Sequence, residues 1–344
     1  MRTWIELGAS LDPSQWAARH RAGEVPDASP YGLHRLQEHG HAVRFRPPPA
    51  GVAELPARVV RRGTGMQWTE AVVGPPPVGT QLCLAWDERA GVPRARLSGR
   101  RTPVATGVIW LDEPGSYPAR PAAVAALRRC ALVWTLAGPQ VPALHALGVA
   151  PSRVAHLLFG VDTEFFVAQD AAAADPDLLV SVGNDRHRDW STLLAGFAEA
   201  RRRRPGLRLE VVTRAALPPA PGVTTHRSLG HADLRQLYAR ASCVVLTTLP
   251  NGHVSGMTAA LEAQASARPV VLSATPGSED YVDHGTTGWL VRPLESATLA
   301  DRLLHALEPG AVAAVGVAGR ARATDLHSTA AMAQRLHGLI AERC

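Results

Sequence analysis

Short apolar runs alternate with helical segments throughout the second half of the chain. Residues 178–182, 209–213 and 243–248 are mostly apolar, which is typical of strands buried on both faces of a parallel sheet. The segments 189–203 and 257–267 combine apolar positions with good helix formers, which favours helices. This alternation predicts an α/β domain built on a parallel sheet. Further strands are expected at 223–226 and 270–274, and further helices at 233–241, 278–282, 296–307 and 329–342.

The first half of the chain shows a less regular form of the same pattern. Ser29 and Pro30 predict the start of a helix over 31–39, since serine is a good cap and proline suits the first helical position. The proline-rich segment 46–80 is expected to be irregular, with at most one helix or strand. Other expected elements are strands at 3–7, 41–45, 82–85, 104–111 and 154–158 and helices at 90–97 and 121–136.

A change in composition predicts a domain boundary near residue 168. Residues 169–177 contain four consecutive alanines and are interpreted as a linker. A chain of 344 residues is long enough for two domains of ordinary size. We therefore expect a first domain over 1–167, a second over 168–326 and a final helical segment over 327–344.

The composition excludes several classes of chemistry. All 36 residues counted as Lys or Arg are arginines, which excludes a P-loop lysine, a pyridoxal Schiff base and a lysine nucleophile. No apolar run approaches the roughly 20 residues of a membrane span. Glu6 and Asp12 come too early for a secretory signal, so we expect a cytoplasmic protein. The four cysteines form no C-x-x-C pair, and no disulfide or zinc framework is expected.

The net charge of +6 suits an anionic ligand, nucleic acid or an acidic membrane surface. The densest basic run, residues 201–204, ends a predicted helix, where cations favour the helix dipole. It lacks the interleaved aromatic residues of single-strand binders. We therefore expect no nucleic-acid partner, while peripheral contact with a membrane stays open.

Ser255, Thr258 and Glu262 follow one another at helical spacing at the start of the segment 257–267. They would lie on one helix face, with Thr258 beside the unpaired amides and the positive dipole end. A nucleotide diphosphate needs amide donors for its phosphates and a carboxylate for its ribose diol. The alternative is a serine cap followed by a solvated glutamate on a surface helix.

Two further groups of polar residues follow predicted strands. Arg186 and Arg188 lie between a strand and a helix, where two guanidinium groups can grip a diphosphate. The alternative is a charged surface loop. Asp87, Glu88 and Asp112 come at the ends of two strands of the first half, where ligands bind in doubly wound sheets. They are candidates for an acceptor site, with Asp87 also a catalytic candidate, and the alternative is capping or loop solvation.

The segment S-G-M-T-A-A-L-E-A-Q-A-x-x-x-P-V-V beginning at Ser255 resembles the nucleotide-sugar site of retaining glycosyltransferases of family 4. The turn G-V-D-x-x-x-F from Gly160 is similar to the junction between the two domains of these enzymes. The resemblance implies two facing Rossmann-like domains with parallel sheets, known as the B-type glycosyltransferase fold. It also implies a C-terminal helix that crosses back onto the first domain.

The resemblance also implies roles for individual residues. Glu262 would bind the donor ribose, and the amides of Gly256, Met257 and Thr258 would bind the diphosphate beside Ser255. Arg188 stands at the position of a phosphate-binding lysine, and Arg186 would compensate for Asn184, which replaces an arginine after Gly183. Weaker matches place Arg227 near the nucleotide base and Gly8 and Ser10 across from the donor. Val254 replaces a glutamate that contacts the donor sugar in the family, which leaves the transferred sugar open.

We therefore expect transfer of a sugar from a nucleotide diphosphate sugar, with a UDP-sugar favoured, to a small-molecule, lipid or glycan acceptor. The resemblance implies retention of the anomeric configuration. No metal and no cofactor are expected, because the only Asp-x-Asp match, Asp175 to Asp177, precedes a strand within the predicted linker. A nucleotide-sugar epimerase on the same fold and a non-catalytic scaffold that binds a partner protein are the alternatives.

Overall fold

The computed structural model describes residues 1–99, 102–111, 120–168 and 174–344. The chain divides into two compact units. Unit 1 comprises Met1–Arg21, Ala28–Leu157 and Met332–Cys344, and unit 2 comprises Ala22–Asp27 and Leu158–Ala331.

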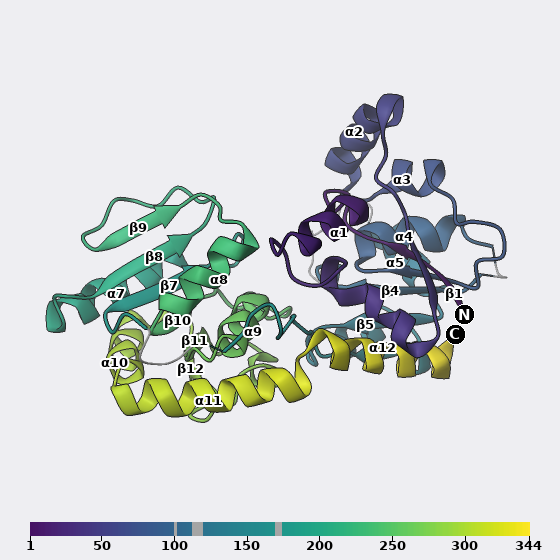
Figure 1. The fold of residues 1–344 in the computed structure, drawn as a ribbon. Coiled ribbons are helices and arrows are strands. Elements are labelled where there is room, and N and C mark those ends of the chain that lie inside the picture. The colour runs from purple at the N-terminus through teal and green to yellow at the C-terminus, as the bar shows by residue number, and fades with distance from the viewer. Residues whose placement is uncertain (100–101, 112–119, 169–173) are drawn as a thin grey trace. The chain divides into compact units, whose positions relative to one another are not determined.

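Unit 1 is built on a parallel six-stranded sheet with the order β2-β1-β3-β4-β5-β6 (Figure 1). β2 lies on one side of β1, and β3 and the later strands lie on the other, so the switch point of the sheet is between β1 and β3. The strands are β1 Arg2–Glu6, β2 Ala42–Phe45, β3 Leu82–Ala85, β4 Val104–Val108, β5 Leu132–Thr135 and β6 Val154–His156. The helices are α1 Pro13–Arg21, η1 Pro30–His39, η2 Gly51–Ala53, α2 Glu54–Thr64, α3 Trp68–Val73, α4 Glu88–Leu97, α5 Arg120–Leu127, α6 Gln140–Ala146, η3 Pro151–Arg153 and α12 Thr329–Arg343, whose first three residues belong to unit 2.

Unit 2 contains a second parallel six-stranded sheet, with the order β12-β11-β10-β7-β8-β9 (Figure 1). Its switch point lies between β7 and β10, which are neighbours in the sheet. The strands are β7 Leu178–Val182, β8 Arg208–Val212, β9 Val223–His226, β10 Cys243–Leu246, β11 Val270–Ser273 and β12 Trp289–Val291. The helices are α7 Trp190–Arg203, α8 His231–Arg240, α9 Met257–Ala265, η5 Ser278–Asp280, α10 Ser296–Ala306 and α11 Pro309–Leu326.

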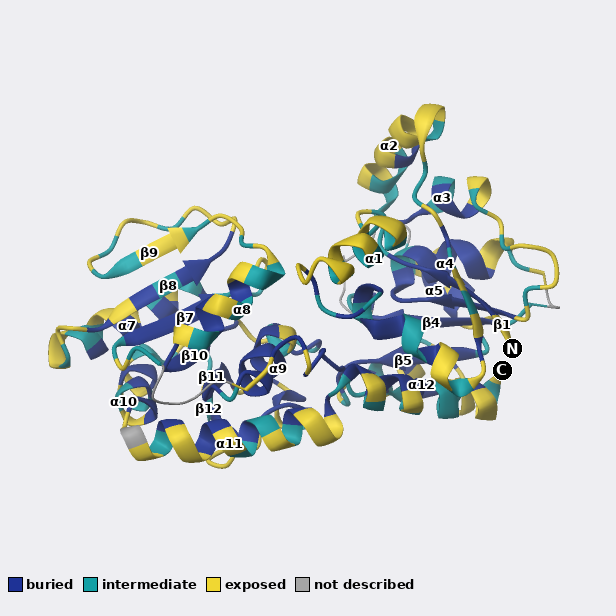
Figure 2. Cartoon of the chain, viewed as in Figure 1, coloured by how far each residue is buried: buried dark blue, intermediate teal, exposed yellow. Residues whose placement is uncertain are grey.

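The chain therefore has the predicted α/β class with two Rossmann-like units, each on a parallel sheet. The central strands of both sheets are buried, the edge strands β2 and β9 are partly exposed, and many helices are buried along one side and exposed along the other (Figure 2). Val180, Val244 and Val271 are fully or almost fully buried in neighbouring strands of unit 2. This burial explains why the apolar runs of the sequence coincide with the strands.

The division between the units differs from the predicted boundary near residue 168, because unit 2 begins at Leu158. Residues 159–166, which resemble the family's domain junction, lie within unit 2, while the predicted linker falls partly on residues 169–173, outside the described ones. The amide of Val161 donates to the His327 carbonyl at 2.8 Å, and the buried Phe166 packs edge to face against Tyr238. At the other end, Met332–Cys344 belongs to unit 1.

Three local predictions are corrected. The segment 121–136, expected to form one helix, forms α5 up to Leu127 and then the buried strand β5 at Leu132–Thr135. The segment expected to be irregular contains two α-helices, Glu54–Thr64 and Trp68–Val73. Most of its prolines lie at its ends, and Pro56 falls in the first turn of α2, where the missing amide has no partner to lose within the helix. The element begun by Ser29 and Pro30 is a 3₁₀ helix, with Tyr31 at φ +59° inside it. Ser29 accepts from the His34 amide at 2.9 Å instead of capping the first turn.

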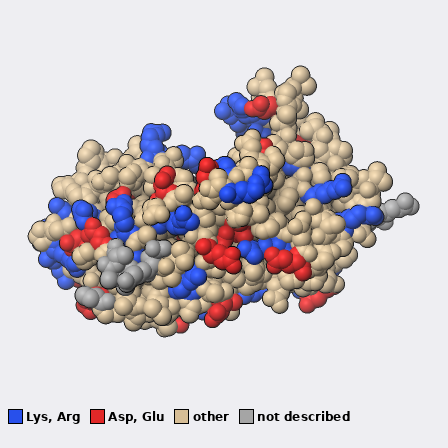
Figure 3. Space-filling view, viewed as in Figure 1, with Lys and Arg blue, Asp and Glu red and all other residues tan. Residues whose placement is uncertain are grey.

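Charged residues are mixed on the surface. On the face in Figure 3, basic and acidic side chains are interspersed, so the positive charge does not form one continuous patch there. Within the described parts of the chain, the helices are all too short or too polar to cross a membrane.

Candidate functional site

The switch point of the unit 2 sheet brings two loops together. The loop of residues 183–189 follows β7, and the loop of residues 247–256 follows β10. They are joined by a backbone bridge between Arg188 and Thr248. Because ligands of doubly wound sheets bind outside the carboxyl ends of the strands at such a point, both loops are placed for binding. Most of the predicted donor-binding residues lie in them or in the first turns of α9.

Arg188 is the most unusual side chain of these loops. It is only 5% exposed, and its Nη2 donates to the Ser181 hydroxyl at 3.2 Å. Its Nε and Nη1 have no hydrogen-bond partner among the residues that the structure describes. Burial lowers the pKa of this guanidinium to about 10, an effect that the charge of Asp185 opposes. Since a buried donor without an acceptor is costly, the arrangement indicates an anionic ligand.

Two glycines make room for this guanidinium. A Cβ atom on Gly183 would lie 2.6 Å from Nε of Arg188, and one on Gly256 would lie 3.0 Å from its Nη1. Both glycines also have positive φ angles, of +156° and +94°, which L side chains rarely adopt. The arginine therefore lies directly against the backbone of both loops, beside the start of α9.

Three hydroxyl groups add to the unsatisfied polar atoms at this end of the sheet. The side-chain oxygens of Thr248, Ser255 and Thr275 are buried and have no hydrogen-bond partner among the described residues. They follow β10, which is next to β7, and β11, which is next to β10. Sequence reasoning selected Ser255 as a donor ligand but missed Thr248, because it was assigned to the end of a buried strand.

Glu262 lies in α9 and is only 8% exposed, so it is not the solvated glutamate of the alternative interpretation. The Tyr238 hydroxyl donates to its Oε2 at 3.0 Å. Burial raises the pKa of Glu262 to about 7, although this hydrogen bond lowers it. Gly256 takes the N-cap position, so Ser255 is not the helix cap, and Thr258 is exposed in the first turn.

The loop before α9 is held by its own hydrogen bonds. The Ser255 amide donates to the Asn251 side chain at 3.0 Å, and the Met257 amide donates to the Val254 carbonyl at 3.1 Å. The Met257 amide, predicted to bind diphosphate, thus closes the turn before α9 in this structure. Val254 is only 1% exposed and has a φ of +50°. This conformation is an outlier for a β-branched residue, of a kind that clusters at functional sites.

The remaining predicted residues of unit 2 lie on its surface. Asn184 is exposed, and its side-chain oxygen accepts from the Arg214 amide at 2.7 Å. Arg186 and Arg227 are also exposed. Beside them, Asp185 accepts from two histidines that sequence reasoning did not select. Although burial raises the pKa of Asp185, its hydrogen bonds to His253 and His187 outweigh this effect and hold the pKa below its usual range.

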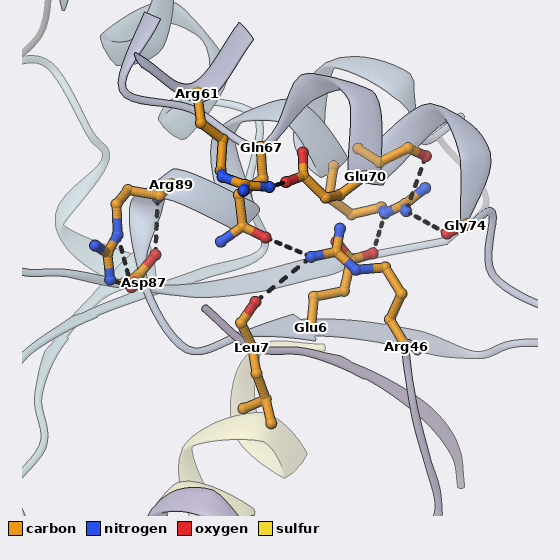
Figure 4. Close-up of polar contacts among 11 residues, drawn as sticks. Glu6, Leu7, Arg46, Arg61, Gln67, Glu70, Gly74, Asp87 and Arg89 are labelled. Atoms are coloured by element: carbon orange, nitrogen blue, oxygen red, sulfur yellow. Dashed lines mark hydrogen bonds and ion pairs between the residues drawn. The ribbon is translucent and has the colours of Figure 1, made fainter. Parts of the chain in front are cut away.

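The residues predicted in the first half lie in unit 1. Gly8 and the exposed Ser10 follow β1, and Asp87 follows β3. Asp87 caps α4 by accepting from the Arg89 amide at 3.0 Å, and its other oxygen accepts from the Arg89 side chain (Figure 4). Its neighbour Glu88 is buried and accepts from the amides of Ile109 and Trp110. These contacts agree with the capping alternative. The third candidate, Asp112, lies outside the described residues.

A buried ion network lies beside these residues, at the end of β1. Glu6 contacts the guanidinium groups of Arg46, at 3.0 Å, and Arg94 (Figure 4). Arg46 also donates to the side chain of Gln67, and Glu70 pairs with Arg61. The charges are thus paired with one another, which is typical of a structural network rather than of an open binding site.

Solved structures with low sequence identity have the same fold along the whole chain. Sucrose-phosphate synthase from Thermosynechococcus elongatus is 17% identical, with a TM-score of 0.72 and 99% of each chain covered. Anabaena HepE, solved in complex with UDP-glucose, is 18% identical, with a TM-score of 0.68 and coverage of 98% of this chain and 99% of that one. The chain has the GT-B glycosyltransferase fold.

The sequence comparisons agree with this GT-B fold. Residues 176–309, which contain the site described above, match the model of the family described as glycosyl transferases group 1. The D-inositol 3-phosphate glycosyltransferase of Frankia alni is 28% identical over 286 residues, which cover 73% of this chain and 69% of that protein. Both comparisons support a relation to group 1 glycosyltransferases of the GT-B type.

Proposed function

We propose that this protein transfers a sugar from a nucleotide diphosphate sugar to an acceptor, as a retaining glycosyltransferase of family 4. The observation that carries the proposal is the buried guanidinium of Arg188, whose Nε and Nη1 lack partners among the described residues. It lies against Gly256 at the start of α9, where a helix dipole favours negative charge. A diphosphate supplies the missing acceptors.

Each part of the donor has a matching group in unit 2. The diphosphate would lie between Arg188 and the amides of Gly256 and Thr258, with Ser255 offering a buried hydroxyl. The carboxylate of Glu262 would accept from the ribose diol. We favour a UDP-sugar, because the similar Anabaena structure holds UDP-glucose. Arg186 and Arg227 are exposed and would reach the phosphates and the base.

The chemical step needs a stabilised leaving group. As the glycosidic bond breaks, negative charge develops on the nucleoside diphosphate, and donors already held in place stabilise it best. We propose that Arg188 supplies this stabilisation without a metal ion. The Asp-x-Asp match does not offer an open ligand pair, because Asp177 accepts from Arg204 at 2.6 Å and Asp175 pairs with Arg208. With no enzyme nucleophile, the leaving phosphate would take the proton of the acceptor on the front side, with retention.

The first half of the chain is expected to select the acceptor. Gly8, Ser10 and Asp87 lie in unit 1, whose charged network is self-paired. We expect a small-molecule, lipid or glycan acceptor, and a role for these three residues stays a prediction.

A thermal-shift experiment tests the donor site. Wild type and Arg188→Gln are melted with a panel of nucleoside diphosphates and their sugars. A ligand at 100 times its Kd stabilises a protein by about 2.7 kcal/mol. We expect UDP or a UDP-sugar to raise the Tm of wild type but not that of Arg188→Gln. The matched control is Arg208→Gln, which removes a mostly exposed arginine of the same unit and leaves the shift intact.

The second candidate is a non-catalytic scaffold, and Val254 is the observation that favours it. An apolar side chain stands where the family resemblance expects a glutamate that contacts the donor sugar. Products formed from the stabilising UDP-sugar decide between the candidates. Release of UDP in the presence of an acceptor supports the transferase, an isomerised sugar indicates an epimerase, and binding without any product indicates the scaffold. The absence of any shift in wild type would refute the donor site itself.

A further inference from the structure

Three side chains that commonly bind metal ions gather beside the arginine site of unit 2. Asp185 and His187 come from the loop of residues 183–189, and His253 comes from the loop of residues 247–256. One ligand atom of each lies within 4.8 Å of the other two. The transfer proposed above does not use them as ligands, and the two histidines were not predicted from the sequence.

The geometry of the three groups resembles that of a small coordination site. His187 Nδ1 lies 3.2 Å from Oδ1 of Asp185, and His253 Nε2 lies 3.2 Å from its Oδ2. In a tetrahedral zinc site with bonds of roughly 2.1 Å, neighbouring ligand atoms are about 3.4 Å apart. Both histidine nitrogens therefore already stand at about the right distance from the carboxylate, and each faces it.

We propose that Asp185, His187 and His253 bind one transition-metal ion of the zinc class, which ties the two loops together. Two imidazoles and one carboxylate suit Zn²⁺, Co²⁺ or Ni²⁺, whereas Mg²⁺ and Ca²⁺ prefer oxygen ligands. The carboxylate would bind through one or both oxygens, and water would complete the coordination. The ion takes no part in sugar transfer.

The surroundings hold the ligands in place. His253 is buried, and Asp185 and His187 are half-buried. The His187 amide donates to Oδ1 of Asp185 at 2.7 Å, which fixes the carboxylate relative to the loop. The two imidazole rings meet edge to face, with centroids 4.9 Å apart. Because groups that orient the ligands strengthen a metal site, little rearrangement is needed to admit an ion.

A bound ion would restrict the motion of the two loops relative to each other. The first loop carries Arg188 and the second carries Gly256, which lie against each other. An ion between the loops would reduce their separate motion and keep this contact closed. The competing explanation is that the two histidine–aspartate hydrogen bonds hold the loops without any metal, and the experiment separates the two.

The test is a calorimetric titration with ZnCl₂ after dialysis against a chelator. All proteins carry Cys344→Ser, because this exposed thiol would bind zinc by itself. We expect one equivalent of zinc to bind the parent. His253→Gln and His187→Gln should each weaken binding at least about 10-fold, since even outer-shell changes cost that much. The matched control is His226→Gln, which removes a histidine paired with Glu210 at 2.8 Å in the same unit and leaves binding unchanged.

Hydrogen exchange gives a second measurement on the same proteins. Saturating zinc should slow amide exchange over 183–189 and 249–256 of the parent, but not of His253→Gln. The proposal is overturned if the parent binds no zinc, or if the three histidine variants bind it equally, because the ion would then lie elsewhere. If His253→Gln does not fold, the more accessible His187→Gln decides alone. None of these results depends on nucleotide binding, so the proposed function can fail or hold independently.

Discussion

Two ionisable side chains of unit 2 are buried with no oppositely charged group in direct contact among the described residues. Arg188 keeps Nε and Nη1 without partners among the described residues, and Glu262 accepts from the neutral hydroxyl of Tyr238. Such residues lower the stability of a folded protein. Their presence at the switch point of the sheet is explained if a ligand supplies the missing partners, as at many functional sites.

The pH dependence of stability tests the state of Glu262. Its pKa is raised from 4.5 to about 7, so between these values the folded chain keeps a proton that the unfolded chain has lost. The contribution of Glu262 to stability therefore falls as pH rises through this window. We expect Glu262→Gln to be more stable than wild type at pH 8, by up to about 3 kcal/mol, and the difference to vanish below pH 4.5. Urea unfolding at several pH values measures it.

The control for this prediction is Tyr238→Phe. It removes the hydroxyl that lowers the pKa of Glu262, so the loss of stability should begin at the same pH and extend to a higher one. A constant difference between Glu262→Gln and wild type from pH 4 to pH 8 would show that the carboxyl group titrates normally.

At the level of single residues, the sequence identifies groups that lie close together along the chain. Glu262 and Thr258 were found because one helix carries both at regular spacing. His253 was missed, because its partner Asp185 is 68 positions away and meets it only through the neighbouring strands β7 and β10. Spacing along the chain does not reveal such a pair.

The start of α9 is the element on which the site depends. Gly256 has a φ of +94° and would place a Cβ 3.0 Å from Arg188. We expect Gly256→Ala to cost roughly 1–2 kcal/mol of stability through its left-handed backbone, and also to displace the guanidinium and weaken nucleotide binding. Urea unfolding and the thermal shift with UDP measure the two effects separately.

A second glycine separates these causes. Gly285 has a φ of +83°, and a Cβ there meets nothing within 4 Å. Gly285→Ala should therefore lose a similar amount of stability and keep the full UDP shift. An equal loss of the shift in both variants would mean that strain, rather than contact with Arg188, controls the site.

Among the elements, most buried strands were predicted, although β5, Leu132–Thr135, was assigned to the end of a helix. Cys243–Leu246 and Val270–Ser273 stand out because both faces of a parallel sheet are covered, so almost every position is apolar. Helix α11, Pro309–Leu326, was missed because it is rich in Ala and Gly and shows no clear apolar stripe. Its place depends on packing against α9 instead: a Cβ on Gly319 would contact the Gln264 side chain at 3.2 Å.

The network at the end of β1 joins several elements of unit 1 through one carboxylate. Glu6→Gln would leave the buried guanidinium groups of Arg46 and Arg94 without their counter-charge. Breaking a buried ion pair by removing one partner costs about 3–5 kcal/mol, and we expect a loss of this size in urea unfolding. Glu54→Gln is the matched control, because its pair with Arg58 is exposed and is worth roughly 0.3–0.5 kcal/mol. Similar losses in both would show that the network is not buried in solution.

At the scale of the whole molecule, chain order and structural units do not coincide. Residues 22–27 belong to unit 2 although they lie between segments of unit 1, and the last residues return to unit 1 after all of unit 2 has been formed. The sequence allowed the return of the C-terminal helix to be expected only through the family resemblance. An amphipathic helix shows which of its faces is buried, but it does not show which domain it packs against.

This arrangement predicts that the C-terminal helix stabilises unit 1 selectively. Leu336 is fully buried in α12, and its neighbour His337 meets His41 of unit 1 at 3.0 Å. Leu336→Ala should cost about 2–5 kcal/mol and speed hydrogen exchange of β1 more than that of β7. Leu303→Ala, at an equally buried position in α10 of unit 2, should do the reverse. If each variant instead destabilised both strands equally, the two units would have to unfold as one cooperative body, and the helix would stabilise the whole chain.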